Sequence, residues 1–128
     1  MYKKFLAIGA VLGAIAVAFG AFGAHGLKKI VSADTVQVFQ TGVQYQMYHA
    51  IALLLTGLLY EKCPPRLVKT AGMLFLIGII LFSGSLYVIT AGKAMENAAL
   101  DKAGIITPFG GLAFIGGWLF LFIAAIRK

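Results

Sequence analysis

The sequence is poor in charged residues. Only 12% of its 128 residues are charged, whereas an ordinary soluble domain has about 25%. Hydrophobic residues make up 61%, and the mean hydropathy is +0.95. This composition excludes a cytosolic enzyme, a disordered tail and a nucleic-acid-binding module, and it predicts an integral membrane protein in contact with the lipid bilayer. The single cysteine also excludes an internal disulfide framework.

Acidic residues are particularly scarce. There are 4 Asp and Glu against 11 Lys and Arg, which gives a formal net charge of +7. In a polar protein this excess would suggest nucleic acid as a partner. Here the basic residues flank apolar stretches, so we interpret them as markers of membrane edges and expect no nucleic-acid partner.

Four stretches are apolar enough to cross a hydrocarbon layer of about 30 Å, which takes about 20 residues. The predicted spans are approximately residues 5–24, 43–60, 71–92 and 105–126. The first is too long for a typical signal peptide, so we expect it to be retained. Asp34 and Gln37 resemble a capping box at the start of the second helix, and Pro64 and Pro65 end that helix. The expected fold is an all-α, integral membrane four-helix bundle in one domain, residues 1–128.

The basic residues also predict the orientation of the chain. With four spans, both termini and the turn at 61–69 share one side, which has seven Lys and Arg against four on the other side. The positive-inside rule therefore predicts cytoplasmic N- and C-termini in a cytoplasmic (inner) membrane.

With this orientation, the uncharged polar residues gather in the outer halves of the spans. If they point inward, they form a polar pocket beneath the outer face. Their alternative role is to link the helices by hydrogen bonds, at about 0.6 kcal/mol each on average. The candidate residues are His25, Gln44, Tyr45, Tyr48, His49, Ser83, Ser85, Tyr87 and Thr107.

The two histidines are the most versatile of these residues chemically. Together His25 and His49 are candidate ligands for a metal or for a haem iron. However, they supply only half of a zinc coordination shell, and no cysteine or carboxylate lies at ligand spacing. We therefore predict no metal site, no catalytic residue and no cofactor.

Sixteen glycines predict close helix packing, because small residues let helix backbones approach each other in lipid. Trp118 lies deep in the fourth span, so its indole N–H needs a partner inside the bundle. The candidate packing residues are Gly9, Gly13, Gly20, Gly23, Gly78, Gly84, Gly110 and Gly111.

Four segments resemble the domain-of-unknown-function family 423. They are Gly20-Ala21-Phe22-Gly23-Ala24-His25-Gly26-Leu27, Tyr45-Gln46-Met47-Tyr48-His49-Ala50, Phe82-Ser83-Gly84-Ser85-Leu86-Tyr87 and Ile106-Thr107-Pro108-Phe109-Gly110-Gly111. The resemblance implies a small, four-span protein of the bacterial cytoplasmic membrane. It implies no substrate, cofactor or catalytic residue.

Three functional hypotheses follow. The first is a non-enzymatic, homo-oligomeric bundle that supports the envelope or binds a protein partner or lipid. The second is a small transporter or channel accessory that uses the outward polar pocket. The third is a cofactor-binding protein with His25 and His49 as ligands.

Overall fold

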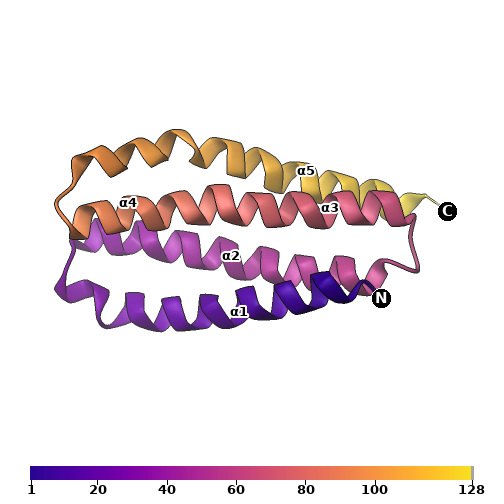
Figure 1. Cartoon of the computed structure of the whole chain (residues 1–128), viewed down its shortest axis with the longest axis horizontal. Helices are drawn as coiled ribbons and strands as arrows, with labels where there is room; N and C mark the ends of the chain where they lie inside the picture. Colours follow the sequence, from indigo (N-terminus) through magenta and orange to yellow (C-terminus); the bar gives the residue numbers. More distant parts are fainter. Residues whose placement is uncertain (128) are drawn as a thin grey trace.

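The chain folds into antiparallel helices that follow one another side by side (Figure 1). The computed structural model describes residues 1–127. The four long elements are α1 (Lys3–Ala24), α2 (Ala33–Leu59), a continuous helical rod of α3 (Pro65–Gly78), η2 (Ile79–Ser83) and α4 (Gly84–Ala94), and α5 (Thr107–Ile126). Short 3₁₀ helices, η1 (Leu27–Lys29) and η3 (Ala98–Ile105), occupy two of the connections. The all-α four-helix prediction is confirmed.

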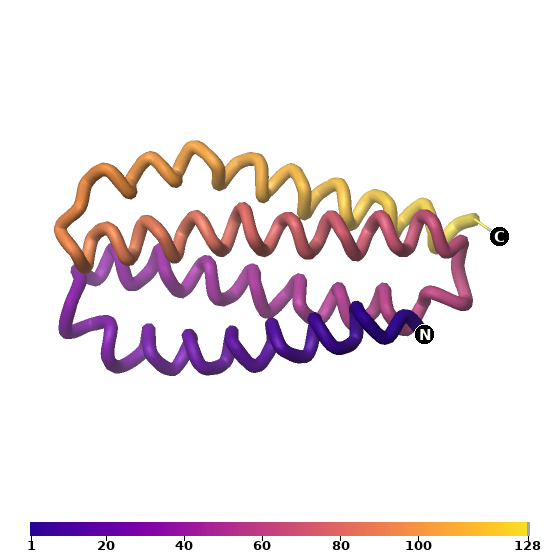
Figure 2. Tube along the Cα trace, in the orientation of Figure 1, coloured from indigo at the N-terminus to yellow at the C-terminus, as the bar shows by residue number. Residues whose placement is uncertain are grey.

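Each helix packs mainly on its neighbour in the sequence. α1 packs on α2, α2 packs on α3, η2 and α4, and α5 packs on α3 and η2. α1 and α5 therefore form opposite sides of the bundle, and α2 lies between α1 and the α3–η2–α4 rod (Figure 2). The N-terminus, the α2–α3 turn and the end of α5 share one end, which we call the termini end. We call the opposite end the loop end.

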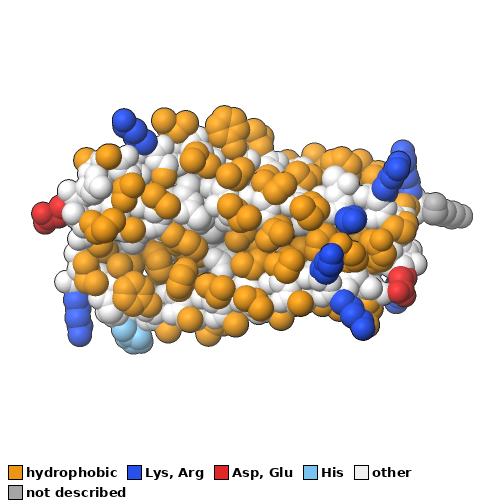
Figure 3. Space-filling view, in the orientation of Figure 1, with side chains coloured by type: hydrophobic (Ala, Val, Ile, Leu, Met, Phe, Trp, Pro, Cys, Tyr) orange, Lys and Arg blue, Asp and Glu red, His pale blue; other side chains and the backbone are white. Residues whose placement is uncertain are grey.

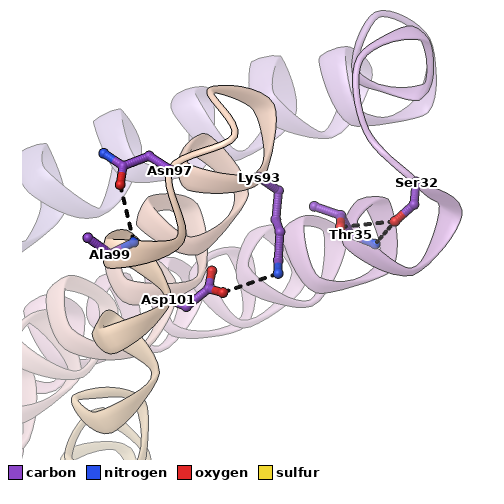
Figure 4. A network of polar contacts seen from close by, with 6 residues as sticks. All are labelled: Ser32, Thr35, Lys93, Asn97, Ala99 and Asp101. Carbon is purple, nitrogen blue, oxygen red and sulfur yellow. Dashed lines mark hydrogen bonds and ion pairs between the residues drawn. The ribbon is translucent and has the colours of Figure 1, made fainter.

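α2 is longer than the predicted span 43–60, because it begins ten residues earlier, at Ala33. The helix is capped by Ser32, whose hydroxyl oxygen accepts a hydrogen bond from the Thr35 amide at 3.3 Å (Figure 4). The predicted capping box at Asp34 is therefore wrong by two residues. Because α2 starts at Ala33, its polar residues around Gln46 lie near the middle of the helix.

The third predicted span, 71–92, corresponds to the longer rod Pro65–Ala94. Pro65 occupies its first turn, where proline is compatible with a helix. The π-helical segment η2 interrupts the rod, a feature that the sequence analysis did not predict. There α5 approaches so closely that a Cβ on Gly110 would lie 2.3 Å from the Phe82 backbone nitrogen.

The segment before α5 is helical and packed, although the composition of residues 93–104 is typical of a solvated loop. η3 packs on α4, where a Cβ on Gly92 would lie 2.7 Å from Leu100. The Asn97 side chain accepts a hydrogen bond from the Ala99 amide at 3.1 Å, and Lys93 pairs with Asp101 at 3.2 Å (Figure 4). η3 thus covers the loop end of α4, and α5 begins further into the bundle.

Three helical segments are long and apolar enough to cross a membrane: Lys3–Lys29, Pro65–Ala94 and Ala98–Ile126. α2 is too polar to qualify by composition, but it runs alongside α1 for almost its full length. The Tyr2 amide donates to the Gly57 carbonyl at the termini end, and Gly23 lies against Gln40 near the loop end. α2 therefore traverses the same thickness as α1. Apolar side chains cover the middle of the face in Figure 3, and charged side chains lie toward its two ends.

The predicted packing glycines differ in how closely a neighbouring helix approaches them. A Cβ on Gly9, Gly23, Gly78 or Gly110 would lie within 3.0 Å of a neighbouring helix, and one on Gly13 or Gly20 would have room. A Cβ on Gly84 would meet nothing closer than 3.9 Å, and one on Gly111 would meet nothing within 4 Å. Close contacts that the prediction missed involve Gly42, Gly57, Gly72, Gly92 and Gly117.

Candidate functional site

Gln46 forms the centre of a polar cluster inside the bundle. Its side-chain amide nitrogen donates to the Leu12 carbonyl of α1 at 2.8 Å. Its amide oxygen accepts from the Tyr87 hydroxyl of α4 at 2.6 Å. Gln46 is only 3% exposed, so these two contacts satisfy a buried amide that would otherwise be costly in an apolar interior. One side chain thus links three helices.

His49 lies one helical turn further along the same face of α2. The Trp118 indole donates to its Nε2 at 3.1 Å, and its Nδ1 is 2.7 Å from the Tyr45 carbonyl. Because an indole N–H can only donate, Nε2 is the acceptor and the proton is on Nδ1. The ring stacks on Phe114, with centroids 3.6 Å apart and an angle of 8° between the planes. His49 therefore joins α2 to α5 as a neutral, fully bonded ring.

The serines of the third span also link helices. The Ser83 hydroxyl donates to the Gly42 carbonyl of α2 at 2.6 Å. The Ser85 hydroxyl contacts the Thr107 hydroxyl of α5 at 2.5 Å and the Phe82 carbonyl at 2.8 Å. Among residues 1–127, every buried side-chain nitrogen or oxygen has a hydrogen-bond partner. We call Gln46, His49, Ser83, Tyr87 and Trp118 the polar core.

The polar core lies near the middle of the bundle, whereas the sequence predicted the outer end. Gly9 of α1 is level with Ala50 of α2, and Leu12 is level with Gln46, both well inside α1. The predicted second span begins at residue 43, and its first polar residues were therefore expected near the outer edge. Thr107, at the start of α5, also lies away from the loop end, because η3 occupies that end of the bundle.

Three predicted pocket residues do not join the others. His25 is exposed at the end of α1, roughly 20 Å along the helix axis from the level of His49. Gln44 and Tyr48 are exposed on the opposite side of α2. Tyr45 is 38% exposed, but its ring packs on Phe82 with centroids 4.8 Å apart.

This geometry does not support joint ligation by His25 and His49. The two rings lie at different depths, and both nitrogens of His49 already have partners. Within residues 1–127 no group of three or more His, Cys, Asp or Glu could hold a metal ion. Surface hollows of about 410 and 260 Å³ lie elsewhere, along α3 and beside Lys28.

Two members of the polar core were missing from the predicted pocket, Gln46 and Trp118. The deep position of Trp118 in the fourth span predicted a partner for its N–H, and His49 provides it. A signal for Gln46 was its place on the row of Phe39, Gly42 and Leu53, which is the buried row of α2. The predicted pocket included Gln44 in its place.

The chain is similar over almost its whole length to bacterial membrane proteins. It is 43% identical to the UPF0382 membrane protein YwdK of Bacillus subtilis, over 98% of both chains. It is 40% identical to a UPF0382 membrane protein of Haemophilus influenzae, over 100% of this chain and 98% of the relative. It is 35% identical to the UPF0382 inner membrane protein YgdD of Escherichia coli, over 99% of this chain and 93% of the relative.

No solved structure matches the chain. The family described as "Protein of unknown function (DUF423)" matches residues 19–111, which include the polar core except Trp118. The fold, the apolar helices and these relatives agree on a multi-pass protein of the inner, or cytoplasmic, membrane. The chain belongs to the DUF423 family, whose relatives are the UPF0382 membrane proteins.

Proposed function

We propose that this protein is a non-enzymatic scaffold of the cytoplasmic membrane, which supports the envelope by binding lipid and protein partners. The observation that carries this proposal is the use of the polar core. The polar side-chain atoms of Gln46, His49 and Ser83 form hydrogen bonds that join α2 to its neighbouring helices. Side chains employed in this way stabilise the bundle and are not free to bind a substrate.

Two substitutions that break the same contact test this proposal. His49→Phe and Trp118→Phe both remove the Trp118–His49 hydrogen bond, because neither variant retains both donor and acceptor, but only the first removes the imidazole. If His49 acts through structure alone, both variants lose similar stability, and their ability to restore envelope integrity to a deletion strain falls in parallel. The measurements are thermal unfolding of the purified protein and growth of the complemented strain in detergent.

A transporter or an enzyme predicts a different result. His49→Phe would then abolish function while Trp118→Phe retained it at equal stability. Solute flux into proteoliposomes that depends on His49 would likewise contradict the scaffold. A Soret absorption band or stoichiometric metal in the gently purified protein would favour the cofactor hypothesis.

We also propose that both termini face the cytoplasm. The termini end carries Lys3, Lys4, Lys62, Arg66, Lys69 and Arg127, and Lys128 lies beyond the described residues. Cys63, in the α2–α3 turn, is a natural probe. In intact cells a membrane-impermeant maleimide should label an Ala98→Cys variant at the loop end and leave Cys63 unlabelled until the membrane is opened. The reverse pattern would overturn this orientation.

The partner best supported by the surface is an anionic phospholipid on α3. Arg66 and Lys69 lie at the rim of the 410 Å³ hollow, and Met73, Leu74 and Ile77 continue it toward the middle of the bundle. This order, positive charge at the interface and apolar surface below it, matches a phosphate headgroup above an acyl chain. The Lys69 ammonium also lies 5.6 Å from the centre of the Tyr2 ring, which holds it at the rim.

Native mass spectrometry with added phosphatidylglycerol tests the lipid site. Arg66→Gln with Lys69→Gln should reduce the number of bound lipids, because together they remove both positive charges. Lys93→Gln with Lys102→Gln removes the same charge at the loop end and should leave binding unchanged. Equal losses in the two pairs would show charge-driven binding with no defined site on α3.

A further inference from the structure

α2 presents one uncovered stripe to its surroundings. The stripe consists of side chains that recur three and four residues apart along α2, and all of them are exposed except the half-buried Thr41. We call them the outward stripe: Thr41, Gln44, Tyr48, Ile51, Leu55 and Leu58. Tyr48 is 55% exposed and Ile51 51%. A spacing of three and four residues keeps a continuous seam on one side of a helix, which is the pattern of helix pairs that pack at a small crossing angle.

The polar half of this stripe lies at membrane depth. Asp34 and Glu61 are the charged residues that bracket α2. At about 1.5 Å per residue, Gln44 lies about 15 Å from Asp34 and about 25 Å from Glu61 along the axis. With a hydrocarbon layer of about 30 Å centred on this segment, Gln44 is several ångströms below the interface, and Tyr48 is close to the midplane.

Neither of these polar groups makes a side-chain hydrogen bond to another helix in the described part of the chain. The side-chain hydrogen bonds that leave α2 for the other long helices come from Gln40, Gln46 and His49, and none involves Gln44 or Tyr48 among residues 1–127. An amide facing lipid tails has lost its hydrogen bonds to water and gained none in return. A surface that supplies hydrogen bonds at this depth is therefore favoured over lipid.

The exposed surfaces of α1 and α5 differ in this respect. At comparable depth α1 exposes Val11 and Ile15, and α5 exposes Leu112 and Ile115. Lipid tails cover such side chains without any loss of hydrogen bonds. The requirement for a protein partner is therefore specific to the outward stripe of α2.

We propose that a second copy of this chain covers the outward stripe. Two copies inserted with the same orientation are related by a twofold axis along the membrane normal, so their α2 helices run parallel and each residue meets its own counterpart. A glutamine amide has both a donor and an acceptor, so two Gln44 side chains satisfy each other reciprocally. The Tyr48 hydroxyls pair at the next level, and Ile51, Leu55 and Leu58 pack below them.

This inference specifies the self-association expected from the sequence and does not depend on the lipid site on α3. It makes Gln44 the specific polar contact of the dimer and the apolar half of the stripe its packing surface. Interhelical hydrogen bonds in membranes average about 0.6 kcal/mol, so losing the two reciprocal bonds corresponds to a roughly eightfold weaker dimer.

Cysteine cross-linking in native membranes tests the surface. In a Cys63→Ser background, Gln44→Cys and Ile51→Cys place a thiol on the stripe, seven residues apart. Oxidation should join both into disulfide-linked dimers, because paired Cβ atoms at a twofold axis come within the roughly 4 Å that a disulfide requires. Val11→Cys and Ile115→Cys are matched controls, 58% and 57% exposed at similar depth on α1 and α5 in the unsubstituted chain, and they should stay monomeric.

The outcomes separate the proposals. Dimers that form through the α1 or α5 control and not through the stripe would overturn this interface but leave self-association intact. Monomers from every variant, together with a monomeric mass in mild detergent, would overturn both. Neither result affects lipid binding by Arg66 and Lys69. A second measurement, Gln44→Leu in the cysteine-free protein, should lower the dimer association constant about eightfold, and an unchanged constant would contradict the role of Gln44.

Discussion

Gln46 and Gln44 are the same kind of side chain on the same helix, two residues apart, yet their environments are opposite. Gln46 is 3% exposed and bonded to both α1 and α4, whereas Gln44 is exposed and makes no hydrogen bond within residues 1–127. The role of a polar residue at membrane depth therefore depends on which side of its helix it occupies. An inward-facing polar side chain joins helices of the same chain, and an outward-facing one favours contact with another protein surface that supplies hydrogen bonds.

The same contrast appears between two adjacent glycines of α5. A Cβ on Gly110 would lie 2.3 Å from the Phe82 backbone, but one on Gly111 would meet nothing within 4 Å. The inward position is fixed by backbone contact with η2, which no side-chain rotation can relieve. The outward position carries no such constraint.

The largest effect is expected at this glycine pair. Gly110→Ala should lower the free energy of unfolding by about 3 kcal/mol, because the added methyl group must displace either α5 or η2. Gly111→Ala should leave it unchanged or slightly raised, since alanine favours a helix by about 0.5–1 kcal/mol over glycine. Unfolding in detergent followed by circular dichroism measures both. Similar losses in the two variants would contradict the close approach of α5 to η2.

The glutamine pair should show an intermediate effect. Gln46→Leu leaves the Tyr87 hydroxyl without its acceptor and removes the second hydrogen bond of the Leu12 carbonyl, which should lower the free energy of unfolding by about 1–3 kcal/mol. Gln44→Leu leaves nothing unpaired inside the bundle, so the stability of the monomer should change by less than about 0.5 kcal/mol. The same unfolding titration, at a protein concentration where the chain is monomeric, compares them. A greater loss for Gln44→Leu would reverse the assignment of the two faces.

The smallest effect is expected for a polar contact outside the membrane. The amino group of Met1 pairs with the Glu61 carboxylate, and this contact lowers the pKa of Glu61. A lowered pKa in the folded state adds stability above the ordinary pKa of a glutamate, and this contribution is lost as the pH falls through the folded-state value. Glu61 is fully exposed, so the contribution is small.

Melting temperatures measured from pH 7 to pH 3 test this contact. Glu61→Gln should flatten the acid limb of the profile slightly, and Glu96→Gln at the loop end serves as the control. An identical flattening in both variants would show that the ion pair contributes nothing of its own.

The sequence was most informative where the physical signal is local. Runs of apolar residues indicated the α1, α3–α4 and α5 spans, and Pro64 and Pro65 indicated the turn before α3. It was least informative for α2. The cap motif at Asp34 came within two residues of the start of the helix, but the mixed composition of the first ten residues left them outside the predicted span. Because that span begins at residue 43, His49 and its neighbours were expected near the edge of the bundle, whereas they lie near its middle.

The π-helical segment and the packed η3 were also beyond prediction from local patterns. η2 lies where α5 approaches through Gly110 and where Ser83 bonds to Gly42, and both contacts join residues distant in the sequence. η3 lies on α4 through the contact of Leu100 with Gly92. The composition of residues 93–104, typical of a solvated loop, gave no sign of that contact.

Composition and apolar run length alone determined that this is an all-α membrane protein with its charges at the ends of the helices, because a hydrocarbon layer imposes that requirement on each segment separately. Only the tertiary structure decided which polar side chains face inward. The rotation of a helix about its axis is set by close contacts such as Gly9 with Ala50 and Gly42 with Tyr87, which join different helices. Those contacts turn Gln46 and His49 toward the interior and leave Gln44 and Tyr48 outside.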